Sequence, residues 1–172
     1  MTNFISKMKE QKENEYREYI KEHVNNVITV FNKLKELNLI PNEIIDQLEI
    51  NVHKHDESKY SPEEFDAYRR RFFPVNEAEK KASFYDFNLA WEHHKKCNPH
   101  HSESPMWYDE RTKTAKPMDP LYAFELICDW QAMSIKFNNR CIDFYHKYPK
   151  YKLHQDTRNL IEPIIMKLDS VF

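Results

Sequence analysis

The stretch IDQLEINVHKHDESKY, residues 45–60, decides the fold. Its apolar residues recur at three- and four-residue spacing, the pattern of one face of an amphipathic helix: Ile45, Leu48 and Val52. His55 continues that face, and Asp56 and Lys59 extend it. We therefore predict a helix that brings polar side chains to the core, where each costs about 1–3 kcal/mol unless something pairs with it.

The segments on either side of this stretch also predict helices. Residues 11–37 show the same period, and His23 lies on the core side of that segment, one turn after Tyr19. The sequence SPEE at residues 61–64 is typical of a capping box with proline at the first helical position. It predicts a short helix that continues to Phe72.

The middle of the chain predicts one more helix and one long loop. A helix is expected over residues 77–97, with His94 on its apolar stripe. Residues 98–118 contain several prolines and predict an ordered loop anchored by Trp107 and Tyr108. Loops of this length in compact domains are often functional.

The last third of the chain predicts two helices. Asp119 followed by proline is typical of a helix start, and the apolar pattern continues to about Lys147 with Asp129 on its inner face. A final helix follows Asp156, and Pro163 either bends it or marks a later start. No strand pattern and no repeat interrupts this series. The fold class is therefore all-α, with about six helices in a single domain over residues 1–172.

The chain contains no glycine among its 172 residues. This excludes the Walker A loop, the GxGxxG dinucleotide turn and the GxSxG nucleophile elbow, because each needs backbone conformations that glycine adopts easily. Any chemistry on phosphate must therefore use side chains or a metal ion.

Charge and composition limit the partners and the compartment. Lysine and arginine total 26 against 28 aspartate and glutamate, a net charge of -2, so no large nucleic acid is expected as a partner. No apolar run approaches the ~20 residues that span a bilayer, so no membrane partner is expected. The first residues lack a secretory signal, and three cysteines without CxxC spacing favour reduced thiols. We expect a cytoplasmic protein.

Four residues follow one another in the order H…HD…D on successive predicted helices: His23, His55, Asp56 and Asp129. Over about residues 23–129, this order resembles the HD superfamily of metal-dependent phosphohydrolases. The segments HDESKY (55–60), AWEHH (90–94) and NPHH (98–101) look more closely like an HD-related family of unassigned function from phages and bacteria. The resemblance implies an HD-like helical bundle.

The resemblance also implies a metal site. In HD enzymes the first histidine, the HD pair and the late aspartate hold the ion, which here would be His23, His55, Asp56 and Asp129. Two nitrogen and two carboxylate ligands suit Mn, Fe, Co, Ni or Zn, and the choice among them stays open. Such an ion activates a water and polarises a phosphoryl oxygen.

A second ion is an open alternative. Some HD phosphodiesterases place two further histidines between the HD pair and the last aspartate. Of His93 and His94, His94 is the better candidate. Of His100 and His101, His101 is preferred. Their spacing is tighter than in those phosphodiesterases, so one ion or two are both open.

Three further residues receive roles. Lys59 matches an HDxxK string in which the lysine faces substrate phosphate. The glutamate that donates a proton in other HD nucleotidases is missing, so Glu92 or a histidine of residues 93–101 is the candidate general acid. Trp107 is either a loop anchor or a base-stacking residue in the substrate pocket. Glu125 is either a partner of the metal ligands or a charge near the helix N-terminus, rather than a ligand.

These observations predict a metal-dependent phosphomonoesterase or phosphodiesterase acting on a nucleotide or related small phosphoester. The alternative is a non-catalytic protein on the same scaffold that binds and sequesters a nucleotide. A helical module with a vestigial site is the third possibility. HD proteins often pair, so a homodimer is also an expectation of the resemblance.

Overall fold

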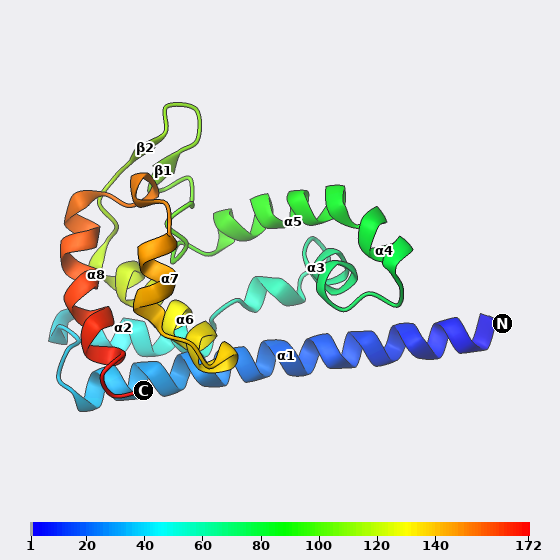
Figure 1. Cartoon of the computed structure of the whole chain (residues 1–172), viewed down its shortest axis with the longest axis horizontal. Helices are drawn as coiled ribbons and strands as arrows, with labels where there is room; N and C mark the ends of the chain where they lie inside the picture. Colours follow the sequence, from blue (N-terminus) through cyan, green and yellow to red (C-terminus); the bar gives the residue numbers. More distant parts are fainter. Residues whose placement is uncertain (1) are drawn as a thin grey trace. The chain divides into compact units, whose positions relative to one another are not determined.

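The computed structural model describes residues 2–172, with side chains from Phe4 onward, and this part of the chain is mostly helical (Figure 1). The helices are α1 (Thr2–Glu36), α2 (Asn42–His53), α3 (Phe65–Phe72), α4 (Glu77–Ala82), α5 (Phe84–Cys97), α6 (Pro120–Phe137), α7 (Cys141–Lys147) and α8 (Gln155–Leu168). Two 3₁₀ helices, η1 (Glu57–Tyr60) and η2 (Lys150–Lys152), and an antiparallel pair of two-residue strands, β1 (Tyr108–Asp109) and β2 (Thr114–Ala115), complete the described elements. The prediction of a helical fold is confirmed, with eight α-helices in place of about six.

The contacts within the chain form two compact units. Unit 1 contains the residues up to Glu22 and Asp56–Cys97, and unit 2 contains His23–His55 and Asn98–Phe172. The long helix α1 contributes residues to both units, and so does the His55-Asp56 dipeptide. The prediction of one domain stays a prediction.

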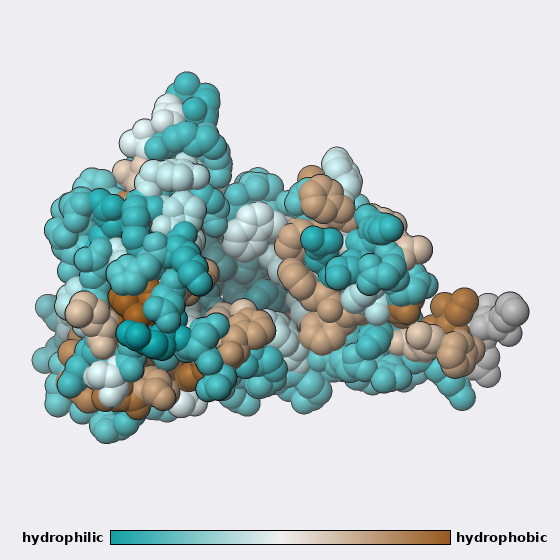
Figure 2. All heavy atoms as spheres, in the orientation of Figure 1, coloured by the Kyte–Doolittle hydropathy of each residue, from teal (hydrophilic) through white to brown (hydrophobic). Residues whose placement is uncertain are grey.

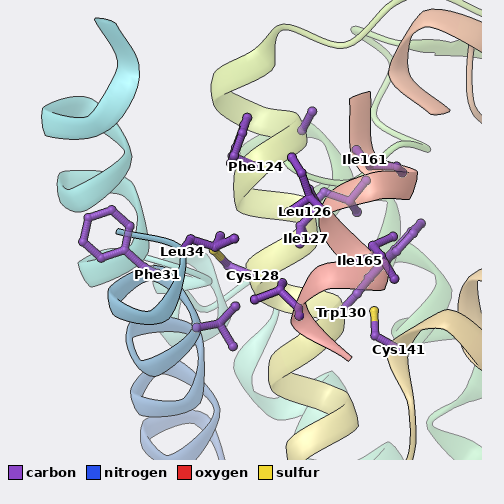
Figure 3. Packing of buried hydrophobic residues seen from close by; sticks show 14 of the residues in the cluster. Phe31, Leu34, Phe124, Leu126, Ile127, Cys128, Trp130, Cys141, Ile161 and Ile165 are labelled. Carbon is purple, nitrogen blue, oxygen red and sulfur yellow. The ribbon is translucent and has the colours of Figure 1, made fainter. Parts of the chain in front are cut away.

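Unit 2 has a continuous apolar core. Helix α6 packs against α2 and α8, and the last turns of α1 add Phe31 and Leu34 (Figure 3). Side chains at the centre are almost completely buried, among them Phe124, Ile127 and Ile165. Because burying one such side chain contributes about 1.5–3 kcal/mol, this core is the main source of stability in unit 2.

Unit 1 combines a small aromatic core with buried ion pairs. Helix α3 packs against α4 and α5, and the ring of Tyr68 lies 5.1 Å from that of Phe87 in an edge-on contact. Arg69 is 1% exposed, and its two terminal nitrogens each lie 2.9 Å from an oxygen of Glu79. Asp66 accepts a further bond from the same guanidinium at 2.9 Å. Unit 1 therefore contains a buried guanidinium whose terminal nitrogens bind two carboxylates.

Helix ends in this glycine-free chain use asparagine. Asn38 after α1 and Asn138 after α6 have φ values of 53° and 49°, the left-handed region that glycine usually supplies at a helix C-terminus. At the second end, the Asn139 N–H donates to the Ser134 carbonyl at 3.0 Å. The predicted single helix from Asp119 to Lys147 is therefore wrong: it is two helices, separated at Asn138.

The helical placement of the HD pair is also wrong. Helix α2 ends at His53, and His55 and Asp56 lie in the turn that follows. Asp56 has a φ of 58°, and Lys59 lies in η1 rather than in an extension of α2. Aspartate tolerates the left-handed conformation better than most residues, and this allows the chain to leave the helix at this point.

Two further helix predictions need correction. Helix α3 begins at Phe65, and Glu64 precedes it without a side-chain cap, because its carboxylate binds His93 and His94 instead. The predicted helix over 77–97 is divided at Ser83, whose hydroxyl donates to the Lys80 carbonyl at 2.8 Å. Serine competes for backbone acceptors in this way, and the competition favours a break.

The predicted loop over residues 98–118 is present and anchored. Tyr108 is buried, and the Trp107 Nε1–H donates to the Pro99 carbonyl at 2.6 Å. The strands β1 and β2 pair Tyr108 with Ala115 inside it.

On the face in Figure 2 hydrophilic residues predominate. Within residues 2–172, every helix is too short or too polar to cross a bilayer.

Candidate metal centre

Unit 2 brings three of the predicted ligands together. His23 comes from the middle of α1, His55 from the turn after α2, and Asp129 from α6. The His23 Nε2 lies 3.0 Å from the Asp129 Oδ1, and the His55 Nε2 lies 3.7 Å from the same oxygen. All three side chains are buried or nearly so. Two helices and the turn after α2 thus direct two imidazoles and one carboxylate to one point.

A buried glutamate fixes the orientation of His55. The His55 Nδ1 lies 3.1 Å from the Glu125 Oε1, and the His100 Nδ1 lies 3.1 Å from the same oxygen. The Asn51 side-chain amide donates to the Glu125 Oε2 at 3.0 Å. When Nδ1 of His55 donates to Glu125, the lone pair on Nε2 faces Asp129 and can bind a cation.

The spacing of these atoms fits a divalent cation. Ligand atoms bound about 2.0–2.2 Å from a metal stand roughly 3.0–3.5 Å apart in tetrahedral or octahedral geometry. The two nitrogen–oxygen distances of 3.0 and 3.7 Å are close to this range. The three ligand atoms all lie within 4.8 Å of one another. The donor set of two nitrogens and one carboxylate suits a transition metal.

The electrostatics of this cluster favour the ionised carboxylates. Burial by itself would raise the pKa of Asp129, but hydrogen bonds from His23 and His55 outweigh it and hold the pKa well below its ordinary value. Burial also opposes ionisation of Glu125, and His100 and His55 again lower its pKa strongly. Both carboxylates are therefore ionised, and a cation would take the place of the protons that the imidazoles share with Asp129.

The other predicted residues of the HD string form a network in unit 1. The Asp56 Oδ2 accepts from Lys59 at 2.5 Å, and the His94 Nε2 lies 3.2 Å from the Asp56 Oδ1. The Nδ1 of His94 binds the Glu64 Oε2 at 2.7 Å. Burial lowers the pKa of His94, but Asp56 and Glu64 raise it more, and the net shift is upward. In both units, therefore, a glutamate holds Nδ1 of an imidazole whose Nε2 faces an aspartate.

Glu92 and Trp107 lie in other surroundings, and His101 lies beside His100. Glu92 is exposed, and its carboxylate accepts from the buried Lys95 at 2.7 Å. Trp107 is half-buried, and its ring lies 5.9 Å from that of Tyr122, so its described contacts are those of a loop anchor. The ring of His101 is half-buried and lies 4.3 Å from that of His100. Their predicted roles in catalysis, substrate binding and metal binding stay predictions.

Sequence reasoning missed or underrated several polar residues at these clusters. His100 is 1% exposed and bound to Glu125, although His101 was preferred from the sequence. Glu64 was interpreted as a capping residue, yet it binds two histidines. The predicted partner role of Glu125 agrees with its bond to His55. A signal was available for His100, since it follows a proline in a segment dense in histidine.

A surface pocket of about 550 Å³ lies elsewhere in unit 2, between α7 and α8. Its lining mixes basic residues with acidic ones: Arg140, His146, Lys150, Asp143, Glu162 and Asp169. It contains none of the predicted site residues, and its mixed charge gives no preference for a phosphate.

Comparison with known proteins gives one family. Searches of curated proteins and of solved structures found no match. Residues 12–167 match the family described as "Family of unknown function (DUF5662)". The matched range contains all three residues of the unit 2 cluster and the network of unit 1. Because this match covers most of the chain, the protein belongs to the DUF5662 family.

Proposed function

We propose that the protein is a metal-dependent phosphohydrolase that acts on a nucleotide or a related small phosphoester. The observation that carries the proposal is the buried cluster of His23, His55 and Asp129, with Glu125 behind His55. The ligand atoms of the three side chains converge on one point, where two nitrogens and one carboxylate oxygen could bind a cation together. The H…HD…D order of the sequence points to the same chemistry.

The residues of the chain have distinct roles in this proposal. His23, His55 and Asp129 hold the ion, and Glu125 keeps the His55 imidazole in the tautomer that presents Nε2. A divalent ion bound there would supply an activated water and polarise a phosphoryl oxygen. The burial of the cluster keeps the ligands in place and reduces competition from bulk water.

Several parts of the proposal rest on the resemblance to HD enzymes. These are the HD-like arrangement of the helices, the role of Asp56 as a fourth ligand, and the role of Lys59 in binding phosphate. The general acid (Glu92 or a histidine of residues 93–101), base stacking by Trp107, and a second ion bound through His94 and His101 have the same basis. The expected homodimer and the range of candidate metals, Mn, Fe, Co, Ni or Zn, also rest on this resemblance. A cytoplasmic location follows from composition alone.

Metal content and turnover test the proposal together. The purified protein should contain a transition metal by elemental analysis and should release phosphate or nucleoside from a panel of nucleotides with Mn²⁺. Asp129→Asn keeps the shape of the side chain and removes its charge, so it should abolish metal binding at this cluster and reduce turnover at least 100-fold, as expected when one charged ligand is lost. The matched control is Asp46→Asn on the exposed face of α2, which should change neither property.

Three outcomes would overturn the proposal or part of it. Full metal content and turnover in Asp129→Asn would contradict the assignment of the site. Tight nucleotide binding without any product would replace hydrolysis by sequestration. Absence of both metal and nucleotide binding in the wild-type protein would leave only a helical module.

A further inference from the structure

Unit 1 contains a second group of ligand-type side chains: Glu64, His93 and Cys97. His93 and Cys97 stand four residues apart on α5, so they lie one above the other on the same side of that helix. Glu64 immediately precedes α3 and is completely buried. The His93 Nδ1 lies 2.8 Å from the Glu64 Oε1, and the Cys97 Sγ lies 3.8 Å from the same nitrogen. One thiol, one imidazole and one carboxylate thus meet within unit 1.

We propose that Glu64, His93 and Cys97 form a zinc-binding site that is separate from the cluster of His23, His55 and Asp129. Sulfur, nitrogen and carboxylate oxygen are the three donor types that zinc accepts. With Zn–S of about 2.3 Å and Zn–N of about 2.0–2.1 Å, a tetrahedral site places the sulfur and the nitrogen about 3.5 Å apart. The Cys97 Sγ and the His93 Nδ1, the nitrogen that also faces Glu64, are 3.8 Å apart, which is close to this value.

The carboxylate of this site is already held in position. The Glu64 Oε2 binds the Nδ1 of His94 at 2.7 Å, and this bond directs Oε1 toward His93. A fixed carboxylate loses little side-chain entropy when it binds an ion. The site is therefore organised by His94, which is not one of its ligands.

The charge around Cys97 also favours a cation. Burial raises the pKa of the Cys97 thiol, and the carboxylates of Glu64 and Glu63 raise it further. The same negative charges attract a divalent ion, which would in turn stabilise the thiolate. Cys97 is the exposed one among the three cysteines, and Cys128 and Cys141 lie buried in unit 2. A metal therefore offers this thiol a role that needs no second cysteine.

Exposure distinguishes the site from a closed structural zinc centre. Cys97 is exposed and the His93 side chain is 35% exposed, so solvent reaches the ligands. Three protein ligands with an accessible fourth position are typical of zinc sites that bind water or a small anion. We infer that the fourth position takes an exogenous ligand.

Cobalt(II) is the probe for this proposal, because a cobalt–thiolate bond gives a near-ultraviolet charge-transfer absorption. Titration of the metal-free protein should produce this absorption, and Cys97→Ser should abolish it. Asp129→Asn should retain the absorption, since Asp129 belongs to the cluster of unit 2. The two variants therefore distinguish a failure of the proposed phosphohydrolase site from a failure of the proposed zinc site. A wild-type protein without thiolate absorption, or Cys97→Ser with undiminished absorption, would overturn the proposal.

Thiol labelling gives a second measurement that does not depend on cobalt. Zn²⁺ should slow the reaction of Cys97 with a disulfide reagent at least tenfold in the wild-type protein. His93→Gln should lose most of this protection, and its helical circular-dichroism signal should match that of the wild-type protein. Equal labelling rates with and without Zn²⁺ in the wild-type protein would contradict the site.

Discussion

The two units hold their polar clusters in different ways. In unit 2, His23, His55 and Asp129 lie beside a continuous apolar core, and all three are buried or nearly so. In unit 1, Glu64, His93 and Cys97 lie at the edge of a small aromatic core, and two of the three are accessible. The difference teaches that the chain can place imidazole and carboxylate groups inside a core, where neighbouring bonds hold them, and at an edge that solvent reaches.

The largest expected effect concerns the core that supports the buried cluster. Ile127→Ala removes a fully buried side chain from the centre of α6 and leaves a cavity, so the free energy of unfolding should fall by about 3–4 kcal/mol. Urea denaturation followed by circular dichroism measures this change. Ile50→Ala on α2, where the side chain is 50% exposed, is the matched control and should cost less than about 1 kcal/mol. Equal losses in the two variants would show that the aliphatic core does not carry the stability of unit 2.

The next effect concerns the metal. A cation that binds only the folded state at 100 times its dissociation constant should raise the free energy of unfolding by about 2.7 kcal/mol. In Asp129→Asn, the metal should no longer stabilise the protein through the cluster of unit 2. In Cys97→Ser, only the stabilisation through the site of unit 1 should be lost. Denaturation curves with and without added metal measure both. An identical increment in Asp129→Asn and the wild-type protein would show that the buried cluster binds no ion.

Much of the fold was accessible from sequence because it rests on local periodicity. Helices α1, α2 and α6 were predicted since their apolar residues recur at the helical period over many turns, and Asp119 does cap α6 by accepting from the Leu121 N–H. The breaks at Asp56, Ser83 and Asn138 were missed because they use residues that helices also tolerate. Without glycine, the chain uses asparagine in the left-handed conformation after α1 and α6 and aspartate in the turn after α2, and a single such residue is a weak signal.

The candidate site was accessible only in part. The resemblance to HD proteins selected His23, His55 and Asp129, and the structure brings these three together. The role of Glu64 was missed because its partner His94 is 30 residues away, and the bond from Glu125 to His55 spans 70 residues. The spacing of residues along one helix gives no information on contacts between residues that are 30 or 70 positions apart in the sequence. The sequence predicted Glu125 as a partner of the ligands, but the imidazole that it binds had to come from the fold.

A smaller effect tests how unit 1 is held together. Glu79→Gln removes the charge of the main partner of the buried Arg69 and leaves Asp66 as its only carboxylate among the described bonds. The free energy of unfolding should fall by about 1.5–3 kcal/mol, the range for hydrogen bonds to charged groups. Glu77→Gln, an exposed glutamate in the same helix, is the control and should change stability by less than about 0.5 kcal/mol. Equal stability of both variants would show that unit 1 relies on its aromatic contacts alone.

The smallest effect is the pH dependence of the same ion pair. Burial opposes ionisation of Glu79, but the bonds from Arg69 and from the Val75 N–H lower its pKa below the ordinary value of 4.5. A lowered folded-state pKa contributes stability that is complete above the unfolded value and is lost as the pH falls through the folded value. The stability difference between the wild-type protein and Glu79→Gln should therefore be constant at neutral pH and shrink as the pH falls below about 4.5. Denaturation midpoints of both proteins across this range measure the effect. A difference that stays constant at low pH would mean that the Glu79 charge does not stabilise Arg69, and unit 1 would then resemble unit 2 in depending on apolar packing.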